Sequence, residues 1–268
     1  MNKKKQILKR VYEHYKESLL YFQKNQIVLC ALQGSQNYNL AVPTSDVDTK
    51  LIVVPSFKDI ALARKPVSTT HVRENEEHID FKDIRSYISC FYKQNLNFLE
   101  ILFTPYSMVN ETYAEEWTRL VKQKELIAHM NPVRGIKSMY GIALEKYHAM
   151  EHRYPSKIDL IDTYGYDAKQ LHHLARIRIF MEHFLNDEPY ADCLLPLGEE
   201  HDYVMSLKTT YMSLDKAREV VNKELARVEE LYSPYKGMEA WENPEARELL
   251  EDVSYNIMRI AVKGELDV

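Results

Sequence analysis

The spacing of apolar residues in the first part of the chain predicts one helix and two strands. Between residues 3 and about 24, four apolar residues recur at helical spacing among Lys and Glu, namely Ile7, Val11, Tyr15 and Leu19. The apolar run 27–32 is too short for an ordinary helix, which is typical of a buried strand. A second strand is expected over 46–54, after a turn at 43–45. These elements predict an amphipathic helix packed on a small sheet.

The following segment alternates between helical and extended patterns. A short helix is predicted over 56–64 and ends before Pro66. The polar segment 67–77 is predicted to be a loop. It leads to a short strand that contains Asp80, and then to a helix over 82–92 that carries its apolar residues on one face.

From residue 113 onward the pattern is helical. Pro132 is placed for the first turn of one helix, and Asp167 is placed to cap the start of another. We therefore predict an α+β protein. A small mixed-sheet domain is expected over 1–120, followed over 121–268 by an α-helical bundle domain that closes a cleft.

Composition narrows the class of protein. The 268 residues are 45% hydrophobic and 28% charged, which is typical of a soluble globular chain. A net charge of −5 and a pI near 6.1 show no overall excess of positive charge, so binding to duplex DNA is not expected. Three widely spaced cysteines, no secretory pattern at the N-terminus and no long apolar run lead us to expect a cytoplasmic protein without a membrane partner.

The stretch from Gly34 to Asp48 carries the candidate chemistry. Gly34 ends the first strand and lets the backbone turn sharply near a ligand, and Ser35 offers a hydroxyl and an N–H to a phosphate. Side chains two apart in a strand share a face, so Asp46 and Asp48 are expected together, with Val47 on the other face. Two neighbouring carboxylates repel unless a cation lies between them, and hard divalent cations take oxygen ligands. We therefore predict an Mg²⁺ site that binds the phosphates of a nucleotide.

Asp80 is the candidate third carboxylate. A neighbouring strand would bring it beside Asp46 and Asp48, and three aspartates can hold two Mg²⁺ ions, or Mn²⁺ in their place. One ion would activate the attacking hydroxyl, and the other would stabilise the leaving pyrophosphate. Glu77 and Asp83 are the alternative third ligands.

The order of these residues resembles the signature of the DNA polymerase β-like nucleotidyltransferase superfamily: Gly34 and Ser35, ten residues, Asp46-x-Asp48, and Asp80 on a later strand. The segments 97–103 and 165–174 also resemble blocks in a branch of stand-alone predicted nucleotidyltransferases of bacteria and phages. The resemblance implies Mg²⁺, a nucleoside triphosphate such as ATP, the three aspartates as catalytic metal ligands, and Gly34 and Ser35 at the triphosphate. It implies no particular acceptor, because members of the superfamily modify RNA or tRNA ends, proteins and small molecules.

The helix that follows Asp167 has a cationic strip that is a second candidate binding surface. Beside its apolar stripe, on or near the opposite face, lie Lys169, His172, His173 and Arg176. If this face lies across a cleft from the aspartates, Lys169, His173 and Arg176 are expected to bind the triphosphate. The alternative is an ordinary solvated helix face.

The paired aspartates also occur in other kinds of site. A calcium loop that begins at Asp46 requires Gly and Glu where Leu51 and Phe57 stand, so this interpretation is excluded. A phosphatase of the DxDx[TV] type requires Thr or Val where Lys50 stands, and a strand where a turn precedes Asp46. A non-catalytic nucleotide-binding or antitoxin-like module on the same fold remains the alternative to an enzyme, although the complete set of aspartates favours catalysis.

Overall fold

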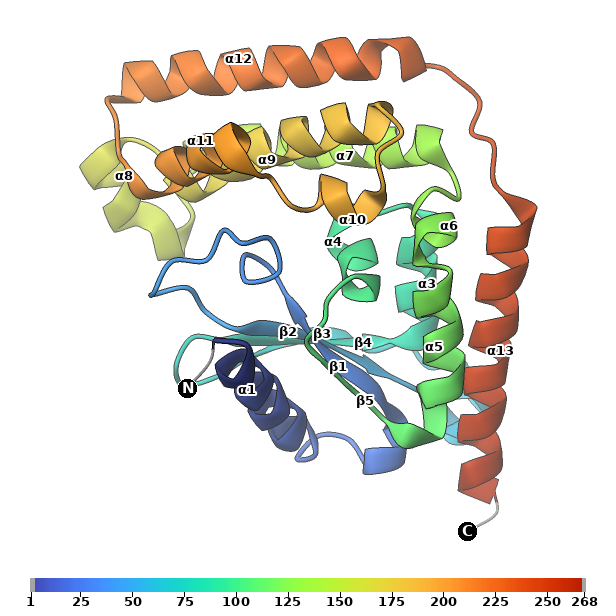
Figure 1. Ribbon diagram of the computed structural model, residues 1–268. Helices are drawn as coiled ribbons and strands as arrows, with labels where there is room; N and C mark the ends of the chain where they lie inside the picture. Colours follow the sequence, from blue (N-terminus) through green and yellow to red (C-terminus); the bar gives the residue numbers. More distant parts are fainter. Residues whose placement is uncertain (1–2, 267–268) are drawn as a thin grey trace. The chain divides into compact units, whose positions relative to one another are not determined.

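The computed structural model describes residues 3–266, and the chain divides into two compact units (Figure 1). The first unit contains the described residues up to Asn37, the segment Ala41–Met130 and the residues from Glu242 onward. The second unit contains Tyr38–Leu40 and Asn131–Trp241. Residues 1–2 and 267–268 of the predicted domain ranges lie outside the described residues.

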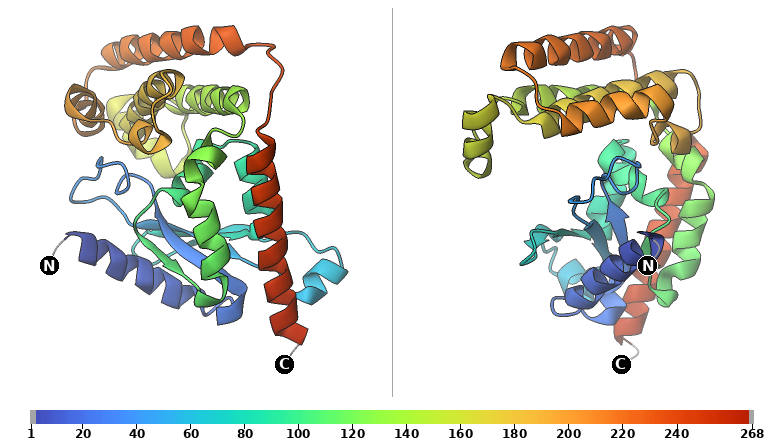
Figure 2. Two further views of the ribbon diagram at one scale, coloured as in Figure 1. Left: turned by 45° about the vertical axis from the view of Figure 1, so that its right-hand side comes forward. Right: turned by 60° about the vertical axis from the view of Figure 1, so that its left-hand side comes forward.

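This division differs from the predicted ranges 1–120 and 121–268. The second unit begins at Asn131 after its short Tyr38–Leu40 segment, and the last helix, α13 (Pro244–Leu266), belongs to the first unit. Figures 1 and 2 show α13 alongside α5 (Ala114–Lys122), and an ion pair between Arg119 and Asp252 joins these two helices. The run of helical patterns along the sequence does not indicate this return of the chain.

A five-stranded mixed sheet forms the centre of the first unit, so the predicted α+β class is confirmed. The strands are β1 (Ile27–Gln33), β2 (Asp48–Val53), β3 (Ser68–Val72), β4 (His78–Asp83) and β5 (Ser107–Val109). They lie in the order β3-β4-β2-β1-β5. The pair of β2 and β4 is parallel, and the other three pairs are antiparallel.

The two faces of the sheet have different coverings, because side chains alternate along each strand. One face packs against α1 (Lys3–Ser18) in a core cluster that includes Ile7, Val11, Cys30, Leu51 and Phe81. The opposite face is partly covered by α3 (Ile84–Tyr92) and α4 (Leu96–Leu99), which Figure 1 shows on the other side of the sheet from α1. We call this second face the site face, because it carries Lys50 and Asp80.

The other helices of the first unit are short. They are α2 (Phe57–Ala61) and α6 (Lys124–Ala128), with 3₁₀ turns at Lys24–Gln26, Glu100–Leu102 and Glu111–Tyr113. The helix predicted from residue 56 is confirmed, since the Ser56 side chain accepts the N–H of Asp59 at its start. The helix predicted over 82–92, with its apolar residues on one face, is α3. It buries Ile84, Tyr87, Ile88 and Phe91.

The second unit is helical. Its helix α9 (Ala168–Leu185) packs against α7 (Pro132–Ala149), α11 (Gly198–Thr209) and α12 (Leu214–Tyr232). Shorter elements are α8 (Ile158–Tyr164), α10 (Tyr190–Cys193) and 3₁₀ turns at Pro155–Lys157 and Ser233–Tyr235. Both predicted helix starts are confirmed, because Pro132 is the first residue of α7 and the Asp167 side chain accepts the N–H of Lys169. Across residues 3–266, no helix is both long and apolar enough to cross a bilayer.

Several local predictions are wrong. The second strand begins at Asp48 and not at residue 46, so Asp46 lies outside the strand. The segment 67–77, predicted to be a loop, contains β3, an edge strand whose side chains are mostly exposed. An exposed edge strand buries neither face, so its polar sequence lacks the alternation that indicates a strand. The first helix ends at Ser18 and not near residue 24, which leaves Leu19 41% exposed.

Candidate active site on the sheet

The turn at Gly34 and Ser35 and the paired aspartates lie at the same end of two neighbouring strands. In the antiparallel pair of β1 and β2, Gln33 is registered opposite Asp48. Gly34 follows Gln33, and Asp46 precedes Asp48 by two residues, so both segments extend beyond the same edge of the sheet. Strand pairing therefore brings together two motifs that lie ten residues apart in the sequence.

Asp48 and Asp80 share the site face. In the parallel pair of β2 and β4, Lys50 is registered opposite Asp80, and side chains two apart in a strand point the same way. The Asp48 carboxylate accepts a hydrogen bond from the backbone N–H of His78, with an N···O distance of 2.8 Å. Asp46 precedes the strand and is exposed.

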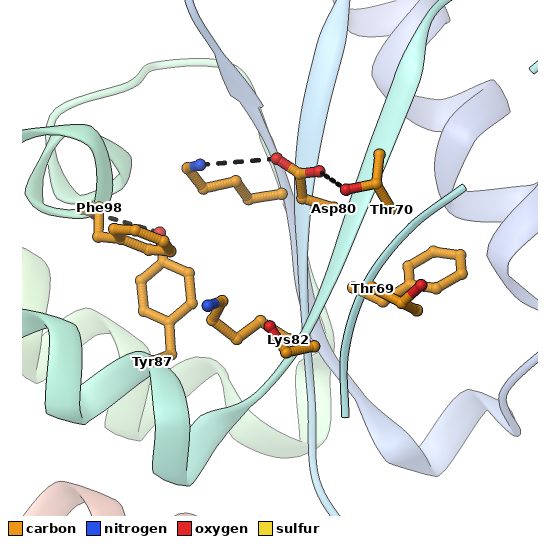
Figure 3. A pocket seen from close by; sticks show the side chains of 9 residues that line it. Thr69, Thr70, Asp80, Lys82, Tyr87 and Phe98 are labelled. Atoms are coloured by element: carbon orange, nitrogen blue, oxygen red, sulfur yellow. Dashed lines mark hydrogen bonds and ion pairs between the residues drawn. The ribbon is translucent and has the colours of Figure 1, made fainter. Parts of the chain in front are cut away.

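Three neighbours hold the Asp80 carboxylate, and Figure 3 shows one of them, Thr70. One oxygen accepts a hydrogen bond from Nε2 of Gln33 at 2.9 Å, and the other accepts one from Oγ1 of Thr70 at 2.7 Å. Nζ of Lys50 lies 3.8 Å from the first oxygen. Since these neighbours come from β1, β3 and β2, three strands fix the position of this carboxylate.

Lys50 is a site residue that the sequence pattern did not indicate. It is 6% exposed, and its Nζ lies 4.6 Å from the centroid of the Phe98 ring. Burial lowers the pKa of the Lys50 ammonium to about 8, although the nearby Asp80 carboxylate acts in the opposite direction. The sequence does contain a feature that could have identified Lys50: it directly precedes the apolar run 51–54, where a charged side chain requires a partner.

Within residues 3–266, no group of three or more His, Cys, Asp or Glu side chains is arranged to hold a metal ion, so the three-aspartate site stays a prediction. The chemistry of Asp46 and Asp48 fits Mg²⁺, because this ion is usually bound by one or two carboxylates together with water and substrate phosphates. Asp46 is exposed and Asp48 partly exposed, which leaves room for such a ligand. Asp80 differs, since both its oxygens already accept hydrogen bonds from neutral donors.

A buried ionic network lies behind the paired aspartates, on the α1 side of the sheet. Glu77 is 7% exposed, and one of its oxygens pairs with Arg10, His14 and Arg73. Its other oxygen accepts the backbone N–H of Val47 at 3.3 Å. Since Val47 lies between the two aspartates, this network holds the backbone that carries them.

Both alternative third carboxylates have other partners. Burial acts to raise the pKa of Glu77, but hydrogen bonds from Arg10 and His14 outweigh it and bring the pKa to about 2. Asp83 accepts the backbone N–H of Arg85 at the start of α3 and pairs with its guanidinium. One feature of the sequence could have indicated the network around Glu77. His14 falls within the apolar stripe of α1 and therefore requires a buried partner.

The helix face predicted to bind triphosphate is mostly buried in the second unit. Lys169 is exposed, but Arg176 is 6% exposed and its guanidinium lies 4.0 Å from the centroid of the Tyr38 ring. His172 is 3% exposed, and its ring lies 4.2 Å from that of His173. The predicted apolar stripe is buried, and His172 and Arg176 are buried as well because α9 packs against α7, α10, α11 and α12. Nucleotide binding by Lys169, His173 and Arg176 stays a prediction.

Burial favours the neutral form of the two adjacent histidines of α9. Burial lowers the pKa of His172 to about 3 and lowers the pKa of His173 well below its ordinary value. Neighbouring cations, including Arg176 and Lys169, act in the same direction. A neutral imidazole offers a phosphate a hydrogen bond but no positive charge.

The Gly34→Ala protein is expected to be less stable than wild type by about 1–2 kcal/mol. Gly34 has a φ of +84°, in the left-handed region, and a Cβ there would meet no atom within 4 Å, so the cost is one of backbone conformation. Gly141 in α7 is the matched control, because a Cβ there also meets nothing within 4 Å. Gly141→Ala is expected to stabilise the helix by up to about 1 kcal/mol. Urea unfolding measures both changes in the free energy of unfolding. A change of the same sign in both proteins would contradict the left-handed backbone conformation given to Gly34.

Comparisons with known proteins find a likeness among solved structures. No family model and no curated protein matches this sequence. Among solved structures, the chain is similar to a nucleotidyltransferase-like protein from Exiguobacterium sibiricum 255-15. The likeness covers 85% of this chain and 74% of that chain, at 13% sequence identity and a TM-score of 0.31. At this TM-score, no residue role is carried from that protein to this chain.

Proposed function

We propose that this protein is a Mg²⁺-dependent nucleotidyltransferase, which moves a nucleoside monophosphate from a nucleoside triphosphate to a hydroxyl acceptor and releases pyrophosphate. The register of β1 and β2 is the observation that supports this most. In this register Gly34 and Ser35 follow Gln33, and Asp46 precedes its partner Asp48, at the same edge of the sheet. In the separate register of β2 with β4, Asp48 and Asp80 share one face. A phosphate turn beside paired carboxylates suits a metal–triphosphate complex.

Each residue has its own role in this proposal. Bound Mg²⁺ would stabilise the charge on the phosphates and on the leaving pyrophosphate. Asp46 and Asp48 hold the ion, Gly34 allows the backbone to approach the triphosphate, and Ser35 donates a hydrogen bond to a phosphate oxygen. Asp80 orients the acceptor hydroxyl, either directly or as the third metal ligand. The acceptor hydroxyl loses its proton to solvent water, its oxygen bonds to the α-phosphorus, and the bond from that phosphorus to the bridging oxygen breaks, which releases pyrophosphate.

Transfer of label from the α-phosphate tests this proposal. The protein is incubated with each ribonucleoside triphosphate labelled at that position, with Mg²⁺ and, in separate reactions, cellular RNA, protein or small metabolites. We expect label on one class of acceptor and an equal amount of pyrophosphate, with both products lost when EDTA is added. Nucleotide binding that needs no Mg²⁺ and leads to no transfer would contradict the proposal and favour the non-catalytic module.

A further inference from the structure

A cavity of about 230 Å³ opens on the site face beside Asp80 (Figure 3). Strands β2, β3 and β4 form one side of it, and α3 and α4 form the other, through Lys50, Ser68, Thr70, Lys82, Tyr87 and Phe98. Pockets that enclose whole drug-sized ligands measure roughly 300–1,000 Å³. This cavity therefore suits a small compound or one end of a larger one.

Two lysines reach into the cavity from adjacent strands. Nζ of Lys50 lies 4.6 Å from the centroid of the Phe98 ring, and Nζ of Lys82 lies 4.7 Å from the same centroid. Lys50 is paired with Asp80, whereas Lys82 forms no ion pair with any side chain in the described part of the chain. The cavity therefore has two ammonium groups and one carboxylate, an excess of one positive charge.

The aromatic wall of the cavity is held in place. Tyr87 is fully buried, and its hydroxyl donates a hydrogen bond to the backbone carbonyl of Phe98 at 3.1 Å. The two rings meet edge to face, with centroids 5.3 Å apart. Contact with an aromatic face leaves the N–H donors of a lysine available, so Lys50 and Lys82 can still bind an anion.

Ser68 adds a neutral donor next to Lys82. It is registered opposite Lys82 in the pair of β3 and β4, so both side chains lie on the site face. Thr70, two residues further along the same strand, donates its hydroxyl to Asp80. The Ser68 hydroxyl has no hydrogen bond within residues 3–266, which leaves it available to a ligand.

We propose that this cavity binds a negatively charged group of the acceptor, a phosphate or a carboxylate, through Lys50, Lys82 and the Ser68 hydroxyl. The inference rests on the proposed nucleotidyl transfer, since it names the class of compound that receives the nucleotide: a small hydroxyl compound with an anionic group. An anion between the two ammonium groups offsets their mutual repulsion. A neutral compound leaves Lys82 without a counter-charge, so neutral compounds are poor acceptors.

Binding of a probe anion in the absence of nucleotide tests the site without reliance on catalysis. The probes are phenyl phosphate and benzoate, with benzyl alcohol as the uncharged control, and affinity is measured by NMR titration. We expect at least one anion to bind and the alcohol not to bind. Lys82→Met should weaken anion binding by about 10–100-fold, as the loss of a charge-assisted hydrogen bond predicts. Phosphate and carboxylate are distinguished by which probe binds more tightly.

Two further variants control for folding and for general charge. Lys82→Arg keeps the positive charge and is expected to keep anion affinity within a few-fold of wild type. Lys58→Met removes an exposed lysine from α2 of the same unit and should leave anion binding unchanged. Equal anion affinity in wild type and in folded Lys82→Met overturns the proposed site, and so does failure of both anions to bind.

The acceptor role is tested separately with the transfer reaction. Support for it is a raised acceptor KM in Lys82→Met with an unchanged KM for the triphosphate. If transfer occurs but Lys82→Met leaves the acceptor KM unchanged, this inference fails while the proposed function stands. If the probe anion binds through Lys82 but no triphosphate supports transfer, the proposed function fails and the acceptor role fails with it.

Discussion

The Asp48→Asn protein is expected to lose nucleotidyl transfer by more than about a hundredfold and to keep its fold. Loss of an outer partner of a metal ligand usually costs roughly 10–100-fold, and Asp48 is proposed to bind the metal directly. Asn keeps a side-chain oxygen that can accept the N–H of His78, which lies 2.8 Å away in the wild type, so the start of β2 is preserved. Transfer of α-phosphate label measures the activity, and circular dichroism measures the fold.

Asp215→Asn is the control for this prediction, because the Asp215 side chain is 98% exposed. Binding of Mn²⁺, followed by electron paramagnetic resonance, gives a readout that does not depend on the acceptor. Mn²⁺ affinity should fall in Asp48→Asn and stay unchanged in Asp215→Asn. Transfer within a few-fold of wild type in Asp48→Asn would refute the metal site.

The Asp80→Asn protein separates the two roles offered for this carboxylate. Lost transfer together with weakened Mn²⁺ binding would identify Asp80 as a third metal ligand. Lost transfer with normal Mn²⁺ binding would identify it as the group that orients the acceptor. Normal transfer would leave Asp80 as a structural partner of Lys50, Gln33 and Thr70.

Glu77→Gln is expected to lower the free energy of unfolding by about 3 kcal/mol at neutral pH. The Glu77 pKa is held at about 2, against an ordinary value of 4.5, by hydrogen bonds that outweigh its burial. Each pKa unit corresponds to about 1.4 kcal/mol. Without the carboxylate, Arg10, Arg73 and His14 lose a buried partner that they share.

The same pKa shift predicts how the effect varies with pH. The folded-state pKa lies below the ordinary value, so Glu77 contributes its full stability above pH 4.5 and loses this contribution as the pH falls toward 2. The difference between wild type and Glu77→Gln should therefore be large at neutral pH and shrink in acid. Urea unfolding over this range measures the difference, and a constant difference would count against the shift.

Glu219→Gln is the matched control for Glu77→Gln. Glu219 also pairs with a basic side chain, Lys216 at 2.8 Å, but its own side chain is 69% exposed. Exposed ion pairs contribute little to stability, because water screens them. Glu219→Gln should therefore leave the free energy of unfolding without measurable change at any pH.

Signals that act over a few residues were sufficient to predict many helices and strands. The apolar spacing of Ile7 and Val11 predicted α1, and the short apolar run predicted β1. Asp167 was recognised as a cap because its side chain bonds to a backbone N–H only two residues away, at 2.8 Å. Such patterns need no tertiary partner to be recognised.

Features that depend on a distant partner could not be predicted in this way. The polar strand β3 exists because β4 pairs with it, and α13 returns to the first unit because α5 offers it a packing surface. His172 and Arg176 are buried because α9 packs on more than one side. In each case the residues of the element itself do not show which distant element it packs against.

By itself, the sequence determined the α+β class, the starts of α7 and α9, and the presence of the Gly34 turn and the paired aspartates, because residue type, strand alternation and capping are local. Only the tertiary structure decided what surrounds those aspartates. Strand pairing brought Gln33 to Asp80 across 47 residues, and the packing of α1 brought Arg10 to Glu77 across 67 residues. The physical reason is that a buried charge is stable only beside a partner, and the tertiary fold determines which residue, near or distant in the sequence, is that partner.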